Sequence, residues 1–436
     1  MTRRRALGRA LLSGVLVGAL SGCGTTLDSL GNDHSAAGGS GNSAGSAGSA
    51  GTTDNGGMPA VLLPITGPSS YPNTFATLLG KSDTEIRNKI QAGFDQLFHG
   101  TATDQPIYYD RGDDGAVIYD VLHDDVRSEG IGLAMLITVE LDKRDEFDHL
   151  WTYAKIRLEQ TSGPAQGYFS SFCDEGTGGP SCFDAYGMQQ FVLALLFAHG
   201  RWKSSTSTPY GSDALTLLDL LQNKERLNGG VVDGIASAFD PTTHLVREEP
   251  TAAAAGYTRS ALEMPASYAL WAQATGNSFW SDAASAARTH ILAAADATTG
   301  FAPMRSYFDG TPVPDSPGFT AQAYRTHLNL AMDALWGSPS ADQIALADRM
   351  LAFFTKQGLD KYGGTFALDG TPIDTNRAQA LVAANGALAV ASSRANRADF
   401  VNAVWTQAIP SGDNRYYDGL FYLMSLLTLS GQLRVY

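Results

Sequence analysis

Apolar residues recur at intervals of three and four along the chain after residue 80, in segments separated by Gly, Pro, Asp and Asn. This spacing is typical of helices that pack through one face. In residues 145–159, for example, Phe147, Leu150, Trp151 and Leu158 fall on one side of a helix. Along the chain the pattern predicts twelve helices, over residues 83–98, 128–142, 145–159, 185–200, 211–223, 260–275, 277–293, 320–336, 340–356, 374–392, 395–408 and 414–431.

The predicted helices fall into two classes of burial. Residues 191–197 and 420–427 are apolar nearly all round, whereas residues 82–98 are amphipathic. Six inner and six outer helices would explain both classes, so we expect an all-α fold, an (α/α)6 barrel. A helical solenoid is the competing fold, but the sequence has no repeat of fixed period. Short strands are expected in the loops, around residues 168–172 and 364–368.

The N-terminus has the pattern of a bacterial lipoprotein signal. Four arginines within the first nine residues precede an apolar run over residues 11–20. The last residue of this run begins the sequence Leu-Ser-Gly-Cys, which ends at Cys23. This pattern predicts cleavage before Cys23 and acylation of its sulfur. The protein would then be anchored by lipid in the cell envelope, at the outer membrane or the cell surface. An ordinary secretory signal with an incidental cysteine is the alternative.

A flexible linker is expected between the lipid anchor and the folded part. Residues 35–57 contain only Ser, Ala, Gly, Asn, Thr and Asp, none of which can nucleate a core. We therefore predict a signal peptide over residues 1–22, a lipidated tether over 23–58 and one large folded domain over 59–436. No second linker interrupts that domain.

The charge of the chain restricts its partners. A formal net charge of -14 argues against nucleic acid or anionic lipid as a partner and favours a neutral substrate. We expect a monomer that contacts the membrane only through its lipid. In an exported protein, Cys173 and Cys182 are expected to form a disulfide, with a reactive thiol as the alternative.

Signatures of cofactors are lacking in the sequence. It contains no phosphate-binding Gly-rich loop, no His-Glu-x-x-His and no paired Cys-x-x-Cys, so neither a cofactor nor a metal is expected. A Gly-x-Ser-x-Gly elbow for acyl transfer is also missing. The remaining chemistry is that of carboxylates and aromatic rings. Cleavage of sugars uses such groups, with one carboxylic acid protonating the leaving oxygen and a second group activating water.

The segment over residues 120–138 carries the most informative carboxylate. Ser128 is expected to cap a helix whose first turn contains Glu129. The helix dipole there stabilises the anion, so a working acid needs burial or a neighbouring negative charge. The alternative role for Glu129 is that of an ordinary acidic residue at a helix start.

Several long motifs occur in order along the folded part. They are Val-Arg-Ser-Glu-Gly at 126–130, the stretch 141–151, Phe-Ala-His-Gly-Arg-Trp at 197–202, Tyr-Phe-Asp-Gly-Thr-Pro within 301–312, Tyr324-Arg325 with Asn329 and Asp333, and the stretch 415–427. Together these motifs resemble glycoside hydrolase family 8, especially its reducing-end xylose-releasing exo-oligoxylanases. The resemblance implies an (α/α)6 barrel that cleaves β-1,4-linked chains (xylan, cellulose or chitosan) with inversion.

The resemblance assigns roles to individual residues. It implies that Glu129 is the general acid and that Arg127 is a cation that binds substrate or sets the pKa of the acid. A third family carboxylate precedes the helix that ends in Trp202, and Asp184 is the candidate. An ungapped count back from Trp202 instead reaches Tyr186.

Aromatic and basic residues near these motifs are candidates for sugar binding. We expect Tyr324, Arg325 and Trp202 to contact the substrate, with the tyrosine favoured for stacking because it lies beside Gln322 and Arg325.

The chain departs from the family on the side that handles water. Many members have an aspartate as general base two residues before the Tyr-Arg pair, and Gln322 occupies that place here. An amide cannot take a proton from water. The family's Pro-Ser-Tyr-x-x-Pro-Ala segment is also altered, with Leu262 in place of the tyrosine. A relocated base would explain both changes, with Glu263 or Asp315 as candidates, and a weak or inactive site would explain them equally.

Three functions follow from these patterns. The first is an inverting glycoside hydrolase that acts on xylo-oligosaccharide or a related β-1,4-linked chain. The second is a carbohydrate-binding surface protein with a degenerate, inactive hydrolase site. The third is phosphorolysis, for which the sequence offers no clear phosphate cradle.

Overall fold

A computed structural model describes most of the compact unit Thr53–Tyr436. The described residues are 59, 61–173, 183, 185–314, 316 and 318–436. The predicted signal peptide, the tether, Cys23, Cys182, Asp184 and Asp315 lie outside them, so the predictions of lipidation and of a disulfide stay predictions.

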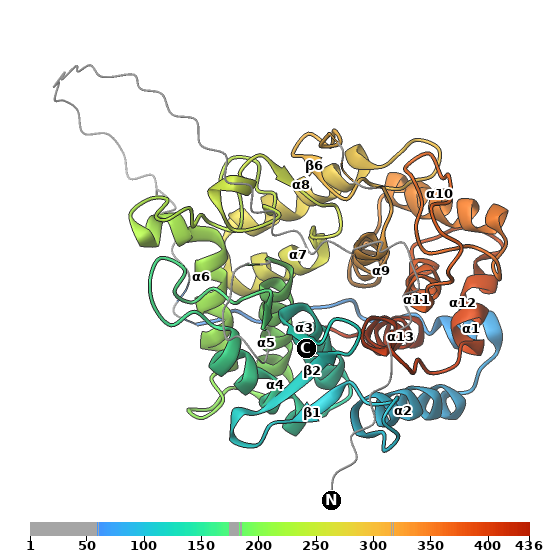
Figure 1. The fold of residues 1–436 in the computed structure, drawn as a ribbon, viewed down its shortest axis with the longest axis horizontal. Helices are drawn as coiled ribbons and strands as arrows, with labels where there is room; N and C mark the ends of the chain where they lie inside the picture. Colours follow the sequence, from blue (N-terminus) through green and yellow to red (C-terminus); the bar gives the residue numbers. More distant parts are fainter. Residues whose placement is uncertain (1–58, 60, 174–182, 184, 315, 317) are drawn as a thin grey trace, which may run out of the picture. The chain divides into compact units, whose positions relative to one another are not determined.

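All twelve predicted helices are present, and together they form the predicted (α/α)6 barrel (Figure 1). The inner helices are α3 (Ser128–Glu140), α5 (Ala185–Trp202), α7 (Pro265–Thr275), α9 (Tyr324–Trp336), α11 (Gln379–Leu388) and α13 (Arg415–Ser430). The outer helices are α2 (Asp83–His99), α4 (Arg144–Tyr153), α6 (Tyr210–Asn228), α8 (Ser278–Ala294), α10 (Ala341–Gln357) and α12 (Arg397–Thr406). One further short helix, α1 (Thr74–Leu79), was not predicted.

The burial of each helix follows its sequence pattern. Every residue of the inner helix α3 is buried, as expected for a segment that is apolar nearly all round. The outer helix α2 buries one stripe that includes Ile86, Ile90 and Phe94, and a capping box between Ser82 and Glu85 fixes its start.

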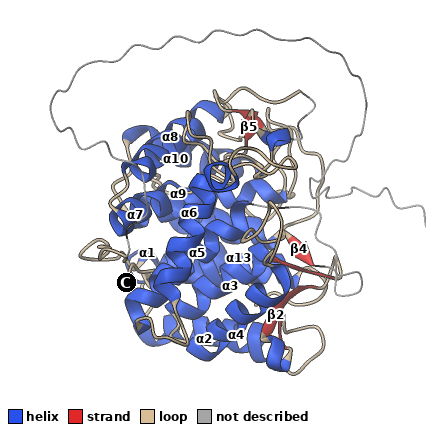
Figure 2. Cartoon of the chain, turned by 90° about the vertical axis from the view of Figure 1, so that its left-hand side faces the viewer, coloured by secondary structure: helices blue, strands red, loops and turns tan. Residues whose placement is uncertain are grey.

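Short strands lie in the loops at one end of the barrel (Figure 2). Four of them form an antiparallel sheet, namely β1 (Tyr108–Asp110), β2 (Ala116–Asp120), β3 (Asp125–Arg127) and β4 (Phe172–Cys173). A second sheet pairs β5 (Tyr257–Thr258) with β6 (Ser306–Tyr307). The strands predicted around residues 168–172 and 364–368 appear as β4 and as isolated bridges of Phe169 and Phe366.

The inner helices run parallel, so the barrel has two distinct ends. The N-terminal ends of α3 and α5 meet, because Ser128 lies against Gly187. Their C-terminal ends meet as well, where Arg201 donates a hydrogen bond to the Glu140 carbonyl. In Figure 2 the strands β2 and β4 lie on one side of the helices and the C-terminus of the chain lies on the other. Within the described residues, no helix combines the length and the apolar character needed to cross a membrane.

Candidate active site

Glu129 lies in the first turn of α3, directly after strand β3. Arg127 is the last residue of the strand and the N-cap of the helix, and its side chain makes no capping hydrogen bond. The prediction that Ser128 caps α3 is wrong, because the backbone at Arg127 is still paired with β4. The Ser128 hydroxyl instead donates to the Ser171 carbonyl, 3.3 Å away. The β3–β4 pairing therefore fixes where α3 begins and where Glu129 lies.

Two glycines allow neighbouring helices to approach this end of α3. A Cβ atom at Gly130 would lie 2.5 Å from the Tyr416 ring on α13, and one at Gly187 on α5 would lie 2.3 Å from Ser128 Oγ. Both distances are far below van der Waals contact, so neither position accepts a larger side chain without movement. Glu129 is therefore directly followed by the glycine at which α3 packs closely against α13.

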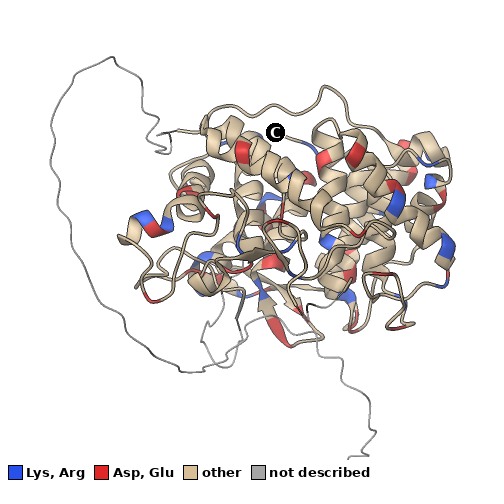
Figure 3. Cartoon of the chain, turned by 90° about the horizontal axis from the view of Figure 1, so that it is seen from above, with Lys and Arg blue, Asp and Glu red and all other residues tan. Residues whose placement is uncertain are grey.

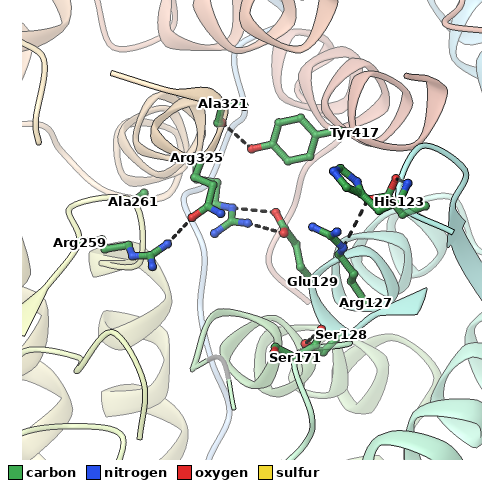
Figure 4. Close-up of polar contacts among 12 residues, drawn as sticks. His123, Arg127, Ser128, Glu129, Ser171, Arg259, Ala261, Ala321, Arg325 and Tyr417 are labelled. Carbon is green, nitrogen blue, oxygen red and sulfur yellow. Dashed lines mark hydrogen bonds and ion pairs between the residues drawn. The ribbon is translucent and has the colours of Figure 1, made fainter. Parts of the chain in front are cut away.

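Glu129 forms a buried two-pronged ion pair with Arg325, the second residue of α9 (Figure 4). Arg325 Nε lies 2.7 Å from Glu129 Oε1, and Arg325 Nη2 contacts Oε2. The two residues are only 6% and 4% exposed. The Arg325 guanidinium also lies over the Tyr186 ring, 4.5 Å from its centroid. This geometry holds the carboxylate firmly at the junction of α3, α5 and α9.

Two tyrosines support the same junction. Tyr417 on α13 donates to the Ala321 carbonyl at 2.8 Å, as Figure 4 shows. Tyr324 is 2% exposed and donates to the Gly364 carbonyl at 2.7 Å. Tyr324 lies beside Arg325 at the start of α9, but its ring is packed in the core and its hydroxyl is bound to backbone, so it ties the α10–α11 loop to α9.

Arg127 lies on the other side of Glu129 from Arg325 in Figure 4. Its guanidinium binds Asp125 through two hydrogen bonds of 2.8 and 3.0 Å and lies 3.4 Å from Asp120 Oδ2. Asp120 also contacts His123. Arg127 is thus surrounded by carboxylates of the β2–β3 hairpin and supplies a fixed positive charge beside the candidate acid.

Gln322 lies in the 3-10 turn η4 (Ala321–Ala323) that precedes α9, and it contacts Arg259. A guanidinium has only hydrogen-bond donors, so the Gln322 carbonyl oxygen faces Arg259 and its NH2 group faces elsewhere. Arg259 also pairs with Glu248, whose Oε1 lies 2.8 Å from Arg305 Nε.

The small sheet β5–β6 organises this second cluster. Arg259 directly follows β5 and Arg305 directly precedes β6, and the pairing of the two strands brings both cations to the one carboxylate of Glu248. Glu248 and Arg259 were not among the site residues expected from the sequence. The only local signal was that Arg259 directly precedes the altered segment that contains Leu262.

The predicted base candidate Glu263 is fully buried, with 0% exposure. Its carboxylate accepts hydrogen bonds from the Thr258 hydroxyl at 2.9 Å and the Val246 N–H at 3.2 Å. Burial raises the pKa of Glu263 to about 8. Leu262, beside it, is 1% exposed. These contacts are those of a buried group that ties the chain around Val246 and Thr258 to the start of α7, and neither contacted residue lies at Glu129 or Gln322.

Trp202 does not lie at this site, contrary to the prediction. It is the last residue of α5, an 18-residue helix whose first turns adjoin Ser128. At about 1.5 Å per residue, Trp202 is about 25 Å further along the barrel. There its ring N–H donates to Asp142 Oδ1 at 2.7 Å. The prediction failed because the motif at 197–202 marks the far end of a long helix.

The described residues offer no cluster of three or more His, Cys, Asp or Glu side chains suited to a metal ion. The candidate site therefore consists of the Glu129–Arg325 pair, the charged hairpin at Arg127 and the Gln322–Arg259–Glu248 cluster. Carboxylates and fixed cations of this kind are suited to acid and base chemistry on a neutral sugar.

Curated relatives of this chain include reducing-end xylose-releasing exo-oligoxylanases and endoglucanases. The reducing-end xylose-releasing exo-oligoxylanase Rex8A of Paenibacillus barcinonensis is 31% identical over 390 residues, covering 85% of this chain and all of that protein. Endoglucanase C of Ruminiclostridium cellulolyticum is 23% identical, covering 85% of this chain and 76% of that protein.

Solved structures of similar proteins share the fold. A glycoside hydrolase family 8 protein of Teredinibacter turnerae in complex with xylobiose has a TM-score of 0.79 and 33% identity, covering 84% of this chain and 98% of its own. Rex8A in complex with xylose has a TM-score of 0.79 and 30% identity over the same shares. The sequence profile of Glycosyl hydrolases family 8 matches residues 112–431, from the β1–β2 turn to the end of α13. This chain therefore belongs to glycosyl hydrolases family 8.

Proposed function

We propose that this protein hydrolyses β-1,4-linked xylo-oligosaccharides with inversion and that Glu129 is the general acid. The observation that carries the proposal is the buried Glu129–Arg325 pair at the N-terminal end of the inner helices. Two relatives match this chain over all or nearly all of their own length, and their names state that they act on xylo-oligosaccharides. The hydrolase class follows from the family. The names of these relatives support xylo-oligosaccharide as the substrate.

The ion pair determines how Glu129 must work. A guanidinium stabilises the charged form of a carboxyl group, whereas the leaving oxygen of the sugar needs a proton. Substrate must therefore draw the Glu129 side chain away from Arg325, and the freed carboxylate must take up a proton from solvent before it can give that proton to the leaving oxygen. The Arg325 guanidinium is then left beside Tyr186, where it can bind a sugar hydroxyl.

Glu248 is our candidate for activating water. It is the carboxylate joined to Gln322 through Arg259, and its two arginine partners favour the charged form that a proton acceptor needs. Glu263 is the weaker candidate because its carboxylate is buried among Thr258, Val246 and Tyr268.

The product profile tests the assignment of substrate and acid. Wild-type protein should shorten xylo-oligosaccharides in a panel that also contains cellulose, mixed-linkage glucan and chitosan oligomers. Glu129→Gln should lower kcat by about a thousandfold, because general acid catalysis contributes about 10²–10⁴. Glu159→Gln, a change of the same kind at the salt bridge with Lys155, is the matched control. Full activity of Glu129→Gln would refute the assignment of the acid.

A second pair of variants tests the water side. Glu248→Gln should lower kcat by about a hundredfold or more, whereas Glu263→Gln should leave kcat within about threefold of wild type. The opposite result would assign the base to Glu263. Repeating the wild-type assay with and without phosphate separates hydrolysis from phosphorolysis.

The second candidate function is carbohydrate binding without cleavage. Gln322 at the family's base position, with its carbonyl oxygen held by Arg259, favours it. Calorimetric binding of xylo-oligosaccharide, with no product after days of incubation, would establish this function in place of hydrolysis.

We further propose that the protein is exported and held in the cell envelope by a lipid on Cys23, with a disulfide between Cys173 and Cys182. The signal pattern before Cys23 supports this location. Wild-type protein should label with radioactive palmitate and sediment with membranes, and Cys23→Ser should do neither. Thiol titration before and after reduction tests the disulfide.

A further inference from the structure

A cavity lies at the opposite end of the barrel from Glu129. Its volume is about 410 Å³, within the range of ligand pockets. It is formed by the start of α2, the ends of α3 and α5 and the last residues of the chain. Glu140 ends α3 at this cavity, about 16 Å along the helix from Glu129. The cavity is therefore separate from the candidate active site.

Three arginines line this cavity in a protein whose net charge is negative. Arg434 is exposed and is held through Nε by the Gly431 carbonyl at 3.1 Å. Among the described residues its two Nη groups make no hydrogen bond, so the fork is available for an anion. Arg87 on α2 is also exposed, and within the described part of the chain its side chain makes one hydrogen bond, to the Thr84 hydroxyl at 3.3 Å. Arg201 is more fixed, because it binds Asp142 and the Tyr436 hydroxyl. In Figure 3 a basic stretch of ribbon adjoins the C-terminus.

Carboxyl groups and tyrosines complete the lining. Glu140 is 5% exposed and accepts hydrogen bonds from the Arg434 N–H at 2.9 Å and the Tyr436 hydroxyl at 3.0 Å. Burial raises the pKa of Glu140 well above its ordinary value. Asp83, the first residue of α2, adds an exposed carboxylate. The phenol of Tyr71 accepts the Val435 N–H at 2.9 Å. The cavity thus offers both strong donors and strong acceptors.

This mixture of groups selects the ligand. A small dianion such as phosphate would suit the arginines but would be repelled by Asp83 and by Glu140 when it is charged. A ligand with one carboxylate and several hydroxyls suits the whole lining, because guanidinium forks bind carboxylates through two bonds and the acidic groups accept hydroxyl protons.

We propose that this cavity is a second binding site for a hexuronic acid, carried as a side group on the xylan chain. The proposal rests on the proposed function for its choice of polymer. Binding there would hold a branched chain on the protein without occupying the site at Glu129.

Calorimetry with the full-length protein tests the proposal. The Glu129→Gln variant prevents cleavage during the titration. The probes are xylotetraose with one glucuronic acid branch, unbranched xylotetraose, free glucuronate and inorganic phosphate. The branched oligosaccharide should show one more binding event per chain than the unbranched one, and glucuronate should bind more tightly than phosphate.

Two variants and one control place the binding event. Arg434→Ala and Arg87→Ala should each weaken glucuronate binding by about tenfold or more, which corresponds to about 1.4 kcal/mol. Arg226→Ala removes an exposed arginine on α6 and should leave binding unchanged. Arg87 lies on the surface with one contact, so loss of folding cannot account for its effect.

Three results would overturn the proposal: equal stoichiometry for branched and unbranched oligosaccharides, phosphate binding as tight as glucuronate binding, or glucuronate binding that is insensitive to both arginine variants. Hydrolysis of unbranched xylotetraose by wild-type protein, measured in parallel, tests the proposed function separately. Its absence would refute the hydrolase and leave the glucuronate titration interpretable.

Discussion

Glu129 and Arg325 lie 196 positions apart in the sequence, yet Arg325 Nε is 2.7 Å from Glu129 Oε1. Each residue belongs to the first turn of an inner helix, and the parallel packing of those helices brings the two first turns together. The guanidinium holds the carboxylate in place and favours its charged form.

Arg325→Gln should change both the rate and its dependence on pH. Loss of the two-pronged contact leaves Glu129 poorly oriented, so kcat/KM should fall by about a hundredfold. Removal of the cation makes the acid hold its proton more tightly, so the alkaline limb of the pH–rate profile should move to higher pH. Steady-state kinetics between pH 4 and 9 provide the measurement.

Arg288→Gln is the matched control for this variant. Arg288 binds Asp333, further along the same helix α9, through two hydrogen bonds of 2.8 and 2.6 Å. Loss of that pair should reduce stability and leave the alkaline limb in place. An equal shift of the limb in both variants would show that Arg325 acts only through the stability of α9.

Gln322→Asp should raise kcat on xylo-oligosaccharide. The new carboxylate would lie against Arg259, which favours its charged form, at the position that the resemblance to the family implies for the base. Gln322→Asn has the same shorter side chain without the charge and should show no gain. Equal rates for wild type and Gln322→Asp would indicate that water is already activated elsewhere, at Glu248.

The helical part of the fold could be predicted because its signal is local. Periodic apolar residues define each helix within about 20 positions, and burial on all sides separates α3 and α13 from the outer α2. The one missed helix, α1, has only 6 residues and is too short to show a period.

The site was only partly predictable because its contacts join distant loops. Glu129 and Arg325 were found through motifs that resemble the family, but their mutual contact was not. Arg259 and Gln322 are 63 positions apart, and Arg305 and Glu248 are 57 apart. The spacing of apolar residues predicts where a helix lies, but it does not predict which loops meet at the end of the barrel. Trp202 shows the opposite error. Its motif resembles the family, so it was expected at the site, but it lies at the far end of the long helix α5.

Glu263 should make stability depend on pH. Its pKa of about 8 in the folded protein exceeds the ordinary 4.5, because of burial. A raised folded pKa gives a contribution that is fully present below pH 4.5 and is lost as the pH rises through about 8. Each pKa unit corresponds to about 1.4 kcal/mol, so the free energy of unfolding should fall by several kcal/mol over this range.

Glu263→Gln isolates this contribution. Its amide oxygen can still accept from Thr258 and Val246, but it does not ionise. Urea unfolding between pH 4.5 and 8.5 should show a smaller loss of stability than wild type. Parallel curves for the two proteins would show that Glu263 is not the group responsible.

Gly130→Ala should disturb both stability and catalysis. The added Cβ would lie 2.5 Å from the buried Tyr416 ring, so α3 and α13 must separate or the ring must turn. Overpacking of this kind costs about 1–3 kcal/mol. Because Glu129 is the preceding residue, the movement should also misplace its carboxylate and lower kcat by about tenfold or more.

Urea unfolding and steady-state kinetics on one preparation of Gly130→Ala measure both effects. Gly256→Ala is the control, since a Cβ there meets no atom within 4 Å. A Gly130→Ala protein with wild-type kcat would show that the position of Glu129 does not depend on this helix contact.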